Sequence, residues 1–418
     1  MMQNNVRVTH PNQKVSGRVQ LTGSKSESNR ALILQALAKG TVEVENLSAA
    51  DDTVTLSRAL QAVAQSDGTL QTVDIGPAGT AMRFLSSYLN LVDGKFRLTG
   101  SKRMQQRPIG LLVDALNELG AHIQYENQEG FPPLIIQGGM VQKTNRITIK
   151  GDISSQYISS LLLVAPALEN GLHIEIEGEL TSRPYVTMTL SILKECGIDS
   201  RFEGNEISIA PQEFQQSTVV VEPDWSAASY WYAIVALSKE GNLILPGLKP
   251  NSLQGDIAIV DIMAHFGVVS SFESDGLHIR KAASPSDQVL FDFKQCPDLA
   301  QTVVVVAAAL KRDVAFTGLE TLKIKETDRI LALQTEIGKF GATLSEKEPG
   351  VYYLDTKQVA DPGDLCFDTY EDHRMAMALA PLALVFDQIQ IREPEVVEKS
   401  YPMFWTHLKT QGFHLQTD

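Results

Sequence analysis

Leu119-Gly120-Ala121 shows most clearly how this chain is built. An apolar segment with helical spacing ends at the glycine, and a strand-like run opens directly after it, as at a left-handed helix cap. The same helix end returns four more times, at Cys196-Gly197-Ile198, Phe266-Gly267-Val268, Phe340-Gly341-Ala342 and Gln411-Gly412-Phe413. Successive glycines lie 70 to 77 residues apart, farther than the repeats of a solenoid, which span about 20 to 50 residues. Each repeat is therefore expected to be a small α/β module.

Six pairs of helices are predicted within these modules. The first helix of each pair starts at a polar or glycine-containing cluster, at Ser26, Gly79, Ser154, Ser226, Asp298 or Asp372. The second helix starts near Val54, Pro108, Pro184, Gly255, Lys325 or Lys399. The two prolines stand where a first helical turn tolerates them. The runs between helices, such as 146–150 and 172–176, alternate or are β-branched, as strands are. Each module should thus read strand, helix, strand, helix, strand, strand.

Two similar domains follow from the distribution of the modules. Three modules precede residue 222 and three follow it, with the turn at 222–224 as the crossing point. We therefore expect an α/β protein with a first domain at 22–222 and a second domain formed by 1–21 plus 223–418, each of three βαβαββ repeats. An N-terminal strand within 14–21 should pair with the second domain. On spacing alone, the alternative that ordinary glycine caps recur by chance stays open.

The charge balance limits the partners of the protein. Lys plus Arg number 36 and Asp plus Glu number 50, which gives a net charge of −14. Such a surface disfavours nucleic acid and anionic lipid, and we expect neither as a partner. An anionic ligand must therefore meet a local cluster of cations.

The cysteines and the apolar runs indicate the cellular compartment in which the protein works. The three cysteines, Cys196, Cys296 and Cys366, form no metal-binding pattern and suit a reducing compartment. The first ten residues carry no secretory or organellar signal features. The longest apolar run, 375–386, is shorter than the ~18 to 20 residues needed to cross a bilayer. We expect a cytoplasmic protein with neither a metal site nor a membrane span.

The segment GSKSESNR, residues 23–30, resembles a phosphate-binding loop. Gly23 allows close backbone approach, Ser26 offers a hydroxyl at a helix start, and Lys25 and Arg30 add positive charge there. It is not the nucleotide P-loop, because Ser24 rather than glycine precedes the lysine. A solvated helix cap would have the same sequence, and this segment alone favours that interpretation.

Comparable clusters open the next helices of the first half. GPAGTAMR, residues 76–83, is another glycine-lined helix start, and Ser154, Ser155 and Gln156 precede an apolar run. RMQQRP places Arg107 just before a helix, and SRPY places Ser182 and Tyr185 at the start of another. Each is weak evidence alone, since such residues are common at helix starts. Their recurrence at equivalent positions strengthens the case for an anion site.

Charged residues also precede helices in the second half. In KETDR we expect Lys325, Glu326 and Arg329 to share one helix face. An exposed ladder of ion pairs would have the same pattern and remains the default alternative. In EDHRMAMAL the trio 372–374 leads into an apolar helix, as at the mouth of a site. His373 alone could equally be a hydrogen-bonded structural residue, and Asp298 a simple helix cap.

Together these motifs supply seven cations against two carboxylates, Asp298 and Glu326. The cations are Lys25, Arg30, Arg107, Lys325, Arg329, Arg374 and Lys399. Such a cluster within an acidic protein is what two small, multiply charged anions require.

In their order and spacing these motifs resemble the 5-enolpyruvylshikimate-3-phosphate synthase family, from about Val15 to Leu408. The motifs that carry the resemblance are GSKSESNR, AGTAMRF, RMQQRPIG, SSQ, SRPY, KETDR and DHRMAMAL. The family fold has two domains of three βαβαββ units each, of the inside-out α/β barrel type. This agrees with the six helix pairs found above from spacing.

The resemblance implies an activity: transfer of the enolpyruvyl group of phosphoenolpyruvate to the 5-hydroxyl of shikimate 3-phosphate, with release of phosphate, on the route to chorismate and the aromatic amino acids. It implies an active site in the cleft between the domains and no metal or organic cofactor. We expect a monomer. Three residues would act in catalysis, with Asp298 as the base, Glu326 as the proton donor and Lys25 assisting the departure of phosphate.

The resemblance also assigns two sets of ligand contacts. Shikimate 3-phosphate would contact Lys25, Ser26, Arg30, Ser154, Ser155, Gln156, Ser182, Tyr185, Asp298 and Lys325. Phosphoenolpyruvate would contact Lys25, the backbone of Gly79, Arg107, Gln156, Arg329, Arg374 and Lys399.

Three positions depart from the family pattern. Pro77 and Thr321 stand where the family has asparagine, and Lys323 where it has arginine, so the affinity for the ligands is in doubt. Two alternatives remain. One is the sister family that transfers the same group to UDP-N-acetylglucosamine, which commonly carries a cysteine that the segment 101–106 lacks. The other is a non-catalytic, anion-binding relative.

Overall fold

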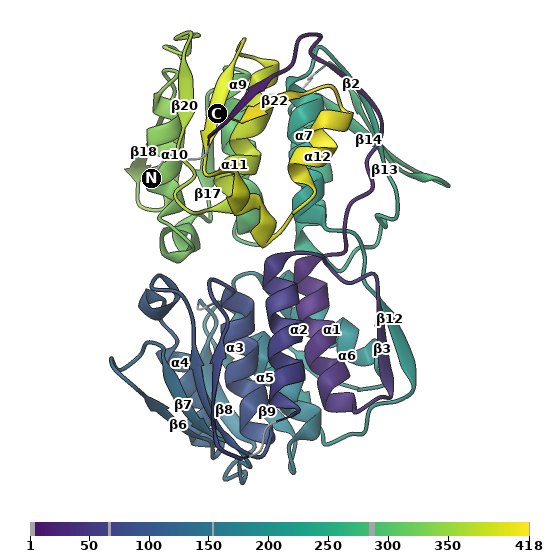
Figure 1. Cartoon of the computed structure of the whole chain (residues 1–418), viewed down its shortest axis with the longest axis vertical. Coiled ribbons are helices and arrows are strands. Elements are labelled where there is room, and N and C mark those ends of the chain that lie inside the picture. Colours follow the sequence, from purple (N-terminus) through teal and green to yellow (C-terminus); the bar gives the residue numbers. More distant parts are fainter. Residues whose placement is uncertain (1–4, 66–67, 153, 284–288, 418) are drawn as a thin grey trace. The chain divides into compact units, whose positions relative to one another are not determined.

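The computed structural model describes residues 5–65, 68–152, 154–283 and 289–417. The chain divides into two compact units (Figure 1). The central unit is Gly23–Glu222, and the terminal unit combines Met1–Thr22 with Pro223–Asp418. Helices pack against sheets in both units, so each has an α/β architecture.

The central unit contains two complete modules of the expected order. The first consists of β4 (Leu70–Asp74), α3 (Gly79–Tyr88), β5 (Lys95–Thr99), α4 (Gly110–Leu119), β6 (His122–Tyr125) and β7 (Leu134–Gln137). The second consists of β8 (Arg146–Lys150), α5 (Ser155–Val164), β9 (Leu172–Glu177), α6 (Arg183–Glu195), β10 (Arg201–Glu203) and β11 (Glu206–Ile209). In each sheet the first two strands are parallel and the closing hairpin is antiparallel.

The remaining module of the central unit differs from the expectation. It consists of α1 (Lys25–Ala38), β3 (Val42–Glu45), α2 (Asp51–Val63) and β12 (Ser217–Val220). The described residues form only a two-stranded parallel sheet here, β12–β3, and no hairpin follows α2. The chain instead passes from α2 directly to β4 of the next sheet, so this module lacks the two closing strands.

The terminal unit contains three modules. The first contains β2 (Lys14–Arg18), α7 (Trp225–Leu237), β13 (Glu240–Leu245), α8 (Ile259–Ala264), β14 (Val268–Glu273) and β15 (Gly276–Lys281). The second contains β16 (Leu290–Asp292), α9 (Ala300–Ala309), β17 (Val314–Thr317), α10 (Arg329–Gly338), β18 (Thr343–Glu348) and β19 (Val351–Asp355). The third contains β20 (Leu365–Phe367), α11 (His373–Leu379), β21 (Ile389–Arg392), α12 (Phe404–Thr410), β22 (His414–Thr417) and β1 (Asn5–Thr9).

The N-terminal segment completes two of these sheets. As expected, β2 pairs with the second half of the chain, in parallel with β13. The additional strand β1 lies between β21 and β22 and is antiparallel to both. The first and last modules of the terminal unit thus each take one strand from the same short N-terminal segment.

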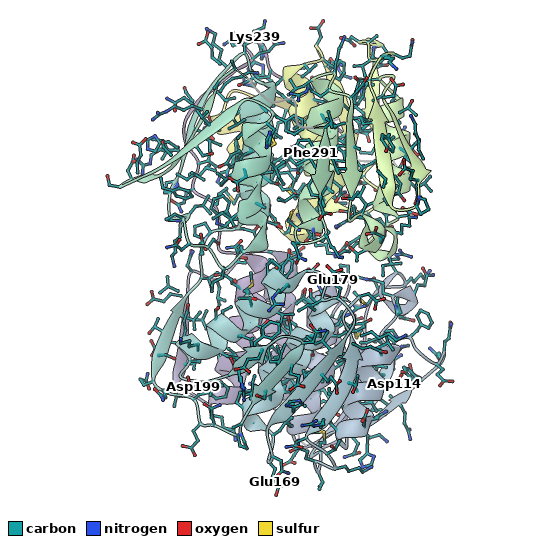
Figure 2. The ribbon with its side chains drawn as sticks, turned by 180° about the vertical axis from the view of Figure 1, so that it is seen from behind. Asp114, Glu169, Glu179, Asp199, Lys239 and Phe291 are labelled. Carbon is teal, nitrogen blue, oxygen red and sulfur yellow. The ribbon has the colours of Figure 1, made fainter. Side chains whose placement is uncertain are left out.

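Two apolar helices form the centre of the terminal unit. Almost every residue of α7 and α9 is buried, which their sequences allow because apolar or small residues occupy all faces. Both helices pack against α11. In the central unit α1, α3 and α5 pack against one another in the same way, whereas charged side chains such as Glu169 and Asp199 lie on the outside of the unit (Figure 2). Within the described residues, no helix combines the length and apolarity needed to span a membrane.

The structure confirms the five repeated glycine ends. Gly120, Gly197, Gly267, Gly341 and Gly412 all have positive φ, between 80° and 117°. Two other expectations were wrong. Residues 325–327 form a bend rather than helix, so α10 begins at Arg329 after its N-cap Asp328, and Pro108 lies two residues ahead of α4 rather than in its first turn. Pro184 does lie in the first turn of α6.

Gly341→Ala tests the role of the repeated glycine. Its φ is +92°, and an added Cβ would lie 2.2 Å from the carbonyl oxygen of Gln358. We expect the free energy of unfolding to fall by about 1–3 kcal/mol, the cost of a strained left-handed residue, measured by urea denaturation. Gly338→Ala is the matched control, because Gly338 is helical and has open space around its Cα. A loss of stability in Gly338→Ala equal to that in Gly341→Ala would contradict the assignment.

Candidate active site

The site in the terminal unit is built at the starts of its helices. Asp298 lies in η5 (Pro297–Leu299) directly before α9, Arg329 opens α10, and Arg374 is the second residue of α11. Lys399 is the last residue of η8 (Pro394–Lys399). Because α9, α10 and α11 pack together, these charged side chains meet at one end of the buried helices.

Arg329 joins three carboxylates. Its Nε donates to Asp372 Oδ2 at 2.7 Å, its Nη1 to Asp298 Oδ1 at 3.1 Å, and its Nη2 to Glu326 Oε2 at 2.8 Å. The side chain is only 2% exposed. A lysine could not replace it, since only the planar guanidinium presents donors in several fixed directions. This one residue fixes the spacing of the three acidic groups.

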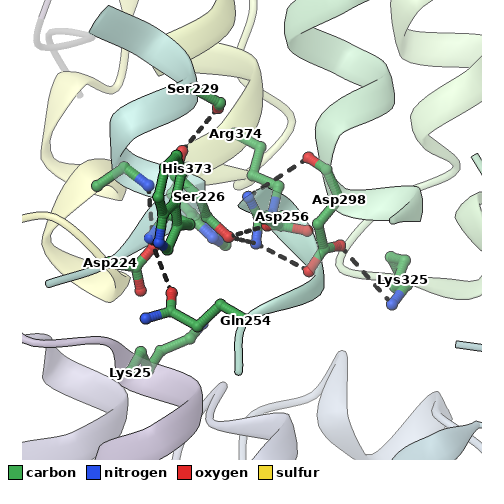
Figure 3. Close-up of polar contacts among 12 residues, drawn as sticks. Lys25, Asp224, Ser226, Ser229, Gln254, Asp256, Asp298, Lys325, His373 and Arg374 are labelled. Carbon is green, nitrogen blue, oxygen red and sulfur yellow. Dashed lines mark hydrogen bonds and ion pairs between the residues drawn. The ribbon is translucent and has the colours of Figure 1, made fainter. Parts of the chain in front are cut away.

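The other predicted cations of this unit join the same network. Arg374 Nη2 donates to Asp298 Oδ2 at 2.9 Å, and Lys325 Nζ lies 3.9 Å from Asp298 Oδ1. Lys399 Nζ donates to Glu326 Oε1 at 2.9 Å. Figure 3 shows Arg374 and Lys325 on either side of Asp298. All six predicted site residues of this unit are therefore connected.

Electrostatics fixes the ionisation of Asp298. Burial alone would raise its pKa, but the positive charges of Arg374, Lys325 and Arg329 hold the pKa of Asp298 well below its usual range. Asp298 is thus a carboxylate at neutral pH.

The helix face expected for KETDR does not form, and the charges of this motif meet in another way. Lys325 and Arg329 do not share a helix face, because only Arg329 is helical. They meet through Asp298, which both contact. Glu326 reaches Arg329 from the bend that precedes α10. Tertiary contacts, rather than helical spacing, bring the charges together.

Sequence reasoning missed three residues around Arg374. Tyr230 Oη accepts from Arg374 Nη1 at 3.3 Å, Ser226 Oγ accepts from Nη2 at 3.3 Å, and Ser226 donates to Asp256 Oδ2. The sequence marks Ser226 only as a helix start. The hydroxyls of Ser226 and Tyr230, one turn apart on the mainly apolar α7, are a usable signal. Asp256 belonged to no recognised motif, and only the fold brings it here.

In the central unit, the loop GSKSESNR forms the start of α1. Ser24 is the N-cap and accepts from the Glu27 backbone N–H, and Lys25 is the first helical residue. Lys25 Nζ donates to Asp52 Oδ2, at the start of α2, at 3.1 Å. The lysine is therefore held by a largely buried carboxylate rather than solvated at the surface.

The starts of α3 and α5 lie next to each other. Gln156 Nε2 donates to Thr80 Oγ1 at 3.3 Å, and Ser154 caps α5 by accepting from the Gln156 backbone N–H. Arg107 covers Gly79 so closely that a Cβ added to Gly79 would lie 2.6 Å from Arg107 Nη1. The absence of a side chain at residue 79 is thus what allows the guanidinium to lie against the first turn of α3.

Arg30 lies deeper than its neighbours in the loop. It is 2% exposed and donates to Thr189 Oγ1 at 2.7 Å, to Ser159 Oγ at 3.1 Å, and to the carbonyl oxygens of Ser26 and Tyr185. Burial lowers the pKa of Arg30 to about 10, so it remains charged at neutral pH. Because it donates to both carbonyl oxygens, Arg30 links Ser26 to Tyr185.

The other predicted contacts of this unit are Ser155, Ser182 and Tyr185, at the starts of α5 and α6. Ser155 and Ser182 are each 8% exposed. Ser182 has a left-handed backbone, with φ 52°, directly before α6. The Tyr185 ring stacks near the Arg30 guanidinium, with a separation of 5.9 Å. The central unit therefore brings its predicted residues to the starts of α1, α3, α5 and α6.

The described residues include one cluster with the spacing of metal ligands, and it contains none of the predicted site residues. It consists of Glu273, Asp275 and His278. Its carboxylates already pair with Arg18 and Arg280. Exposed acidic groups of this kind are common without a metal, and we assign it no function.

Comparison with known proteins identifies the chain. The family model for EPSP synthase, 3-phosphoshikimate 1-carboxyvinyltransferase, matches residues 9–408. The chain belongs to the EPSP synthase family. Within that family it is 46% identical over 404 residues to the 3-phosphoshikimate 1-carboxyvinyltransferase of Bacteroides fragilis strain YCH46, covering 96% of this chain and 97% of that protein. It is 36% identical to that of Shewanella piezotolerans, covering 95% and 97%.

Solved structures agree on the fold. EPSP synthase from Acinetobacter baumannii aligns with a TM-score of 0.79 and 21% identity, over 100% of both chains. The enolpyruvyl transferase NikO from Streptomyces tendae aligns with a TM-score of 0.75 and 15% identity, over 100% of this chain and 99% of that one. The resemblance and the fold class inferred from the sequence are confirmed, and the family match favours EPSP synthase over the sister family.

Asp372→Ala tests the network around Arg329. Asp372 caps α11 and pairs with Arg329, and both side chains are buried. We expect the free energy of unfolding to fall by about 3 kcal/mol or more, because a buried arginine loses a partner. The matched control is Asp328→Ala, which removes only the cap of α10 and should cost about 1 kcal/mol. Equal losses in urea denaturation would show that Arg329 does not depend on Asp372.

Proposed function

We propose that this chain transfers the enolpyruvyl group of phosphoenolpyruvate to the 5-hydroxyl of shikimate 3-phosphate and releases phosphate. The observation that carries the proposal is the arrangement around Asp298, a half-buried carboxylate flanked by Arg374, Arg329 and Lys325. A hydroxyl can be deprotonated there while adjacent cations bind anionic groups of the substrates.

The reaction is an addition followed by an elimination. The 5-oxygen attacks C2 of the donor as its proton leaves, and a proton is added to the methylene carbon, which gives a tetrahedral ketal phosphate. Loss of a methyl proton and of phosphate from C2 then restores the double bond. Each step needs one group that accepts a proton, one that donates a proton, and fixed positive charge for the leaving phosphate.

We assign the base to Asp298, the proton donor to Glu326 and the assistance of phosphate departure to Lys25. The three cations around Asp298 weaken it as a base in the free protein. An anionic ligand that draws Arg374 away would raise the proton affinity of Asp298 at the moment it is needed. Lys399 Nζ, 2.9 Å from Glu326 Oε1, is placed to pass a proton to that carboxylate.

The remaining predicted residues are proposed as ligand contacts. For shikimate 3-phosphate these are Lys25, Ser26, Arg30, Ser154, Ser155, Gln156, Ser182, Tyr185, Asp298 and Lys325. For phosphoenolpyruvate they are Lys25, the Gly79 backbone, Arg107, Gln156, Arg329, Arg374 and Lys399. Because the two sets draw on both units, we propose that the ligands bind between them. All these residues lie on one chain, so we expect a monomer to suffice for activity. Because the protein is acidic, we expect no nucleic acid partner.

A phosphate-release assay tests the function. The purified protein with phosphoenolpyruvate and shikimate 3-phosphate should release phosphate, whereas UDP-N-acetylglucosamine as the acceptor should give none. Lys25→Ala and Asp298→Ala, one in each unit, should each lower kcat by about 10²- to 10⁴-fold. The exposed residues Lys239 and Asp199 provide the controls, Lys239→Ala and Asp199→Ala (Figure 2), which should retain activity. Full activity in either site variant would contradict a site shared by both units.

Gly79→Ala tests the contact with Arg107. The added methyl group would overlap the guanidinium and displace it. We expect the KM for phosphoenolpyruvate to rise by about tenfold, as for the loss of about 1.4 kcal/mol of binding, with a much smaller change in the KM for shikimate 3-phosphate. Gly338→Ala, where space is open, should change neither constant. An unchanged KM for phosphoenolpyruvate in Gly79→Ala would place Arg107 outside the binding site of that ligand.

A further inference from the structure

Arg374 is held from two sides. On one side its Nη2 donates to Asp298 Oδ2 at 2.9 Å. On the other side lie two hydroxyls of α7, with Tyr230 Oη 3.3 Å from Nη1 and Ser226 Oγ 3.3 Å from Nη2. Figure 3 shows Ser226 and Asp298 both linked to this guanidinium. The first anchor is a proposed catalytic group, whereas the second belongs to the scaffold.

The second anchor ends in a buried carboxyl group. Ser226 Oγ donates to Asp256 Oδ2, and Asp256 is 2% exposed. A serine whose proton points to a carboxylate presents its lone pairs to the guanidinium. Asp256 thereby fixes the direction in which Ser226 acts on Arg374.

Neighbouring contacts keep Asp256 in place. Asp256 belongs to η4 (Gly255–Ala258), and Gln254 just before it accepts from the Trp225 backbone N–H at 2.8 Å and donates to the Pro223 carbonyl at 2.9 Å. The short segment 254–256 is thus bonded to the start of α7 at both ends. Ser226 therefore has little freedom to turn away from Arg374.

Burying Asp256 is unfavourable, and its hydrogen bonds do not compensate for the loss of water around both carboxyl oxygens. Its Oδ1 is buried and, among the described residues, has no hydrogen-bond partner. Burial, and then the nearby charge of Asp298, raise the pKa of Asp256 to about 7. Buried, half-satisfied carboxyl groups are rare where structure alone is served.

We propose that Ser226 and Asp256 are positioning residues that hold Arg374 ready for an anionic group of phosphoenolpyruvate. This inference rests on the proposed function. When the substrate hydroxyl binds Asp298, the carboxylate has fewer lone pairs for Arg374. The Ser226–Asp256 pair then holds the Arg374 guanidinium in position, so that it moves neither with the Asp298 carboxylate nor out into the solvent. Neither residue touches the reacting atoms in this role.

Steady-state kinetics of single and double variants test whether Ser226 and Asp256 position Arg374 as one linked pair. Ser226→Ala and Asp256→Asn should each raise the KM for phosphoenolpyruvate by about tenfold, the value of one hydrogen bond to a charged group, and leave kcat nearly unchanged. The double variant should resemble either single variant, because both remove the same link. Ser226→Thr keeps the hydroxyl and should restore the KM. Ser238→Ala, a buried serine at the far end of α7, is the control.

The outcomes separate the two hypotheses. If the wild-type protein does not turn over shikimate 3-phosphate, the proposed function fails and this inference fails with it. If the wild type is active, the inference alone is overturned by an unchanged KM in Ser226→Ala, or by effects of the two variants that multiply to about a hundredfold. Thermal melting of each variant shows whether it is folded, and Ser226→Ala decides the question should Asp256→Asn not fold.

Discussion

The ion pairs of Arg329 are the interaction on which the terminal unit's site depends. One guanidinium, almost inaccessible to water, binds Asp298, Glu326 and Asp372 and so links the second module to the third. Arg374 extends the link to the first module through Ser226 and Tyr230 on α7. Without such pairing, several like charges could not be held together in a low-dielectric interior. The site and the packing of the three modules are therefore stabilised by the same contacts.

The glycine ends show what the sequence could predict. A left-handed helix end is a local property, because it depends on one residue and its backbone, and all five predicted glycines have positive φ. The missing hairpin after α2 and the bend at Lys325 depend instead on how distant segments pair. Local spacing carries no information about those pairings, so both were predicted wrongly.

The residues of the candidate site show the same difference between local sequence signals and tertiary contacts. Motifs at helix starts revealed Lys25, Arg107 and Arg374, since charge beside glycine or serine is visible in the sequence. Asp256 remained hidden, because nothing around it in the chain marks it, and only tertiary structure places it behind Ser226. Residues at helix starts fall in motifs that the sequence shows, whereas a residue such as Asp256 is brought to its neighbours only by the fold.

The position of β1 and β2 has a consequence for biosynthesis. These strands are synthesised before the central unit, yet β2 pairs with β13, and β1 lies between β21 and β22, which come far later in the sequence. The central unit is contiguous and can fold during translation, while residues 5–18 must wait until their partner strands in the second half, up to residue 417, have emerged. Pairing of such high sequence separation is slow, so β1 and β2 keep unpaired strand edges, which favour aggregation, while the rest of the chain is being synthesised.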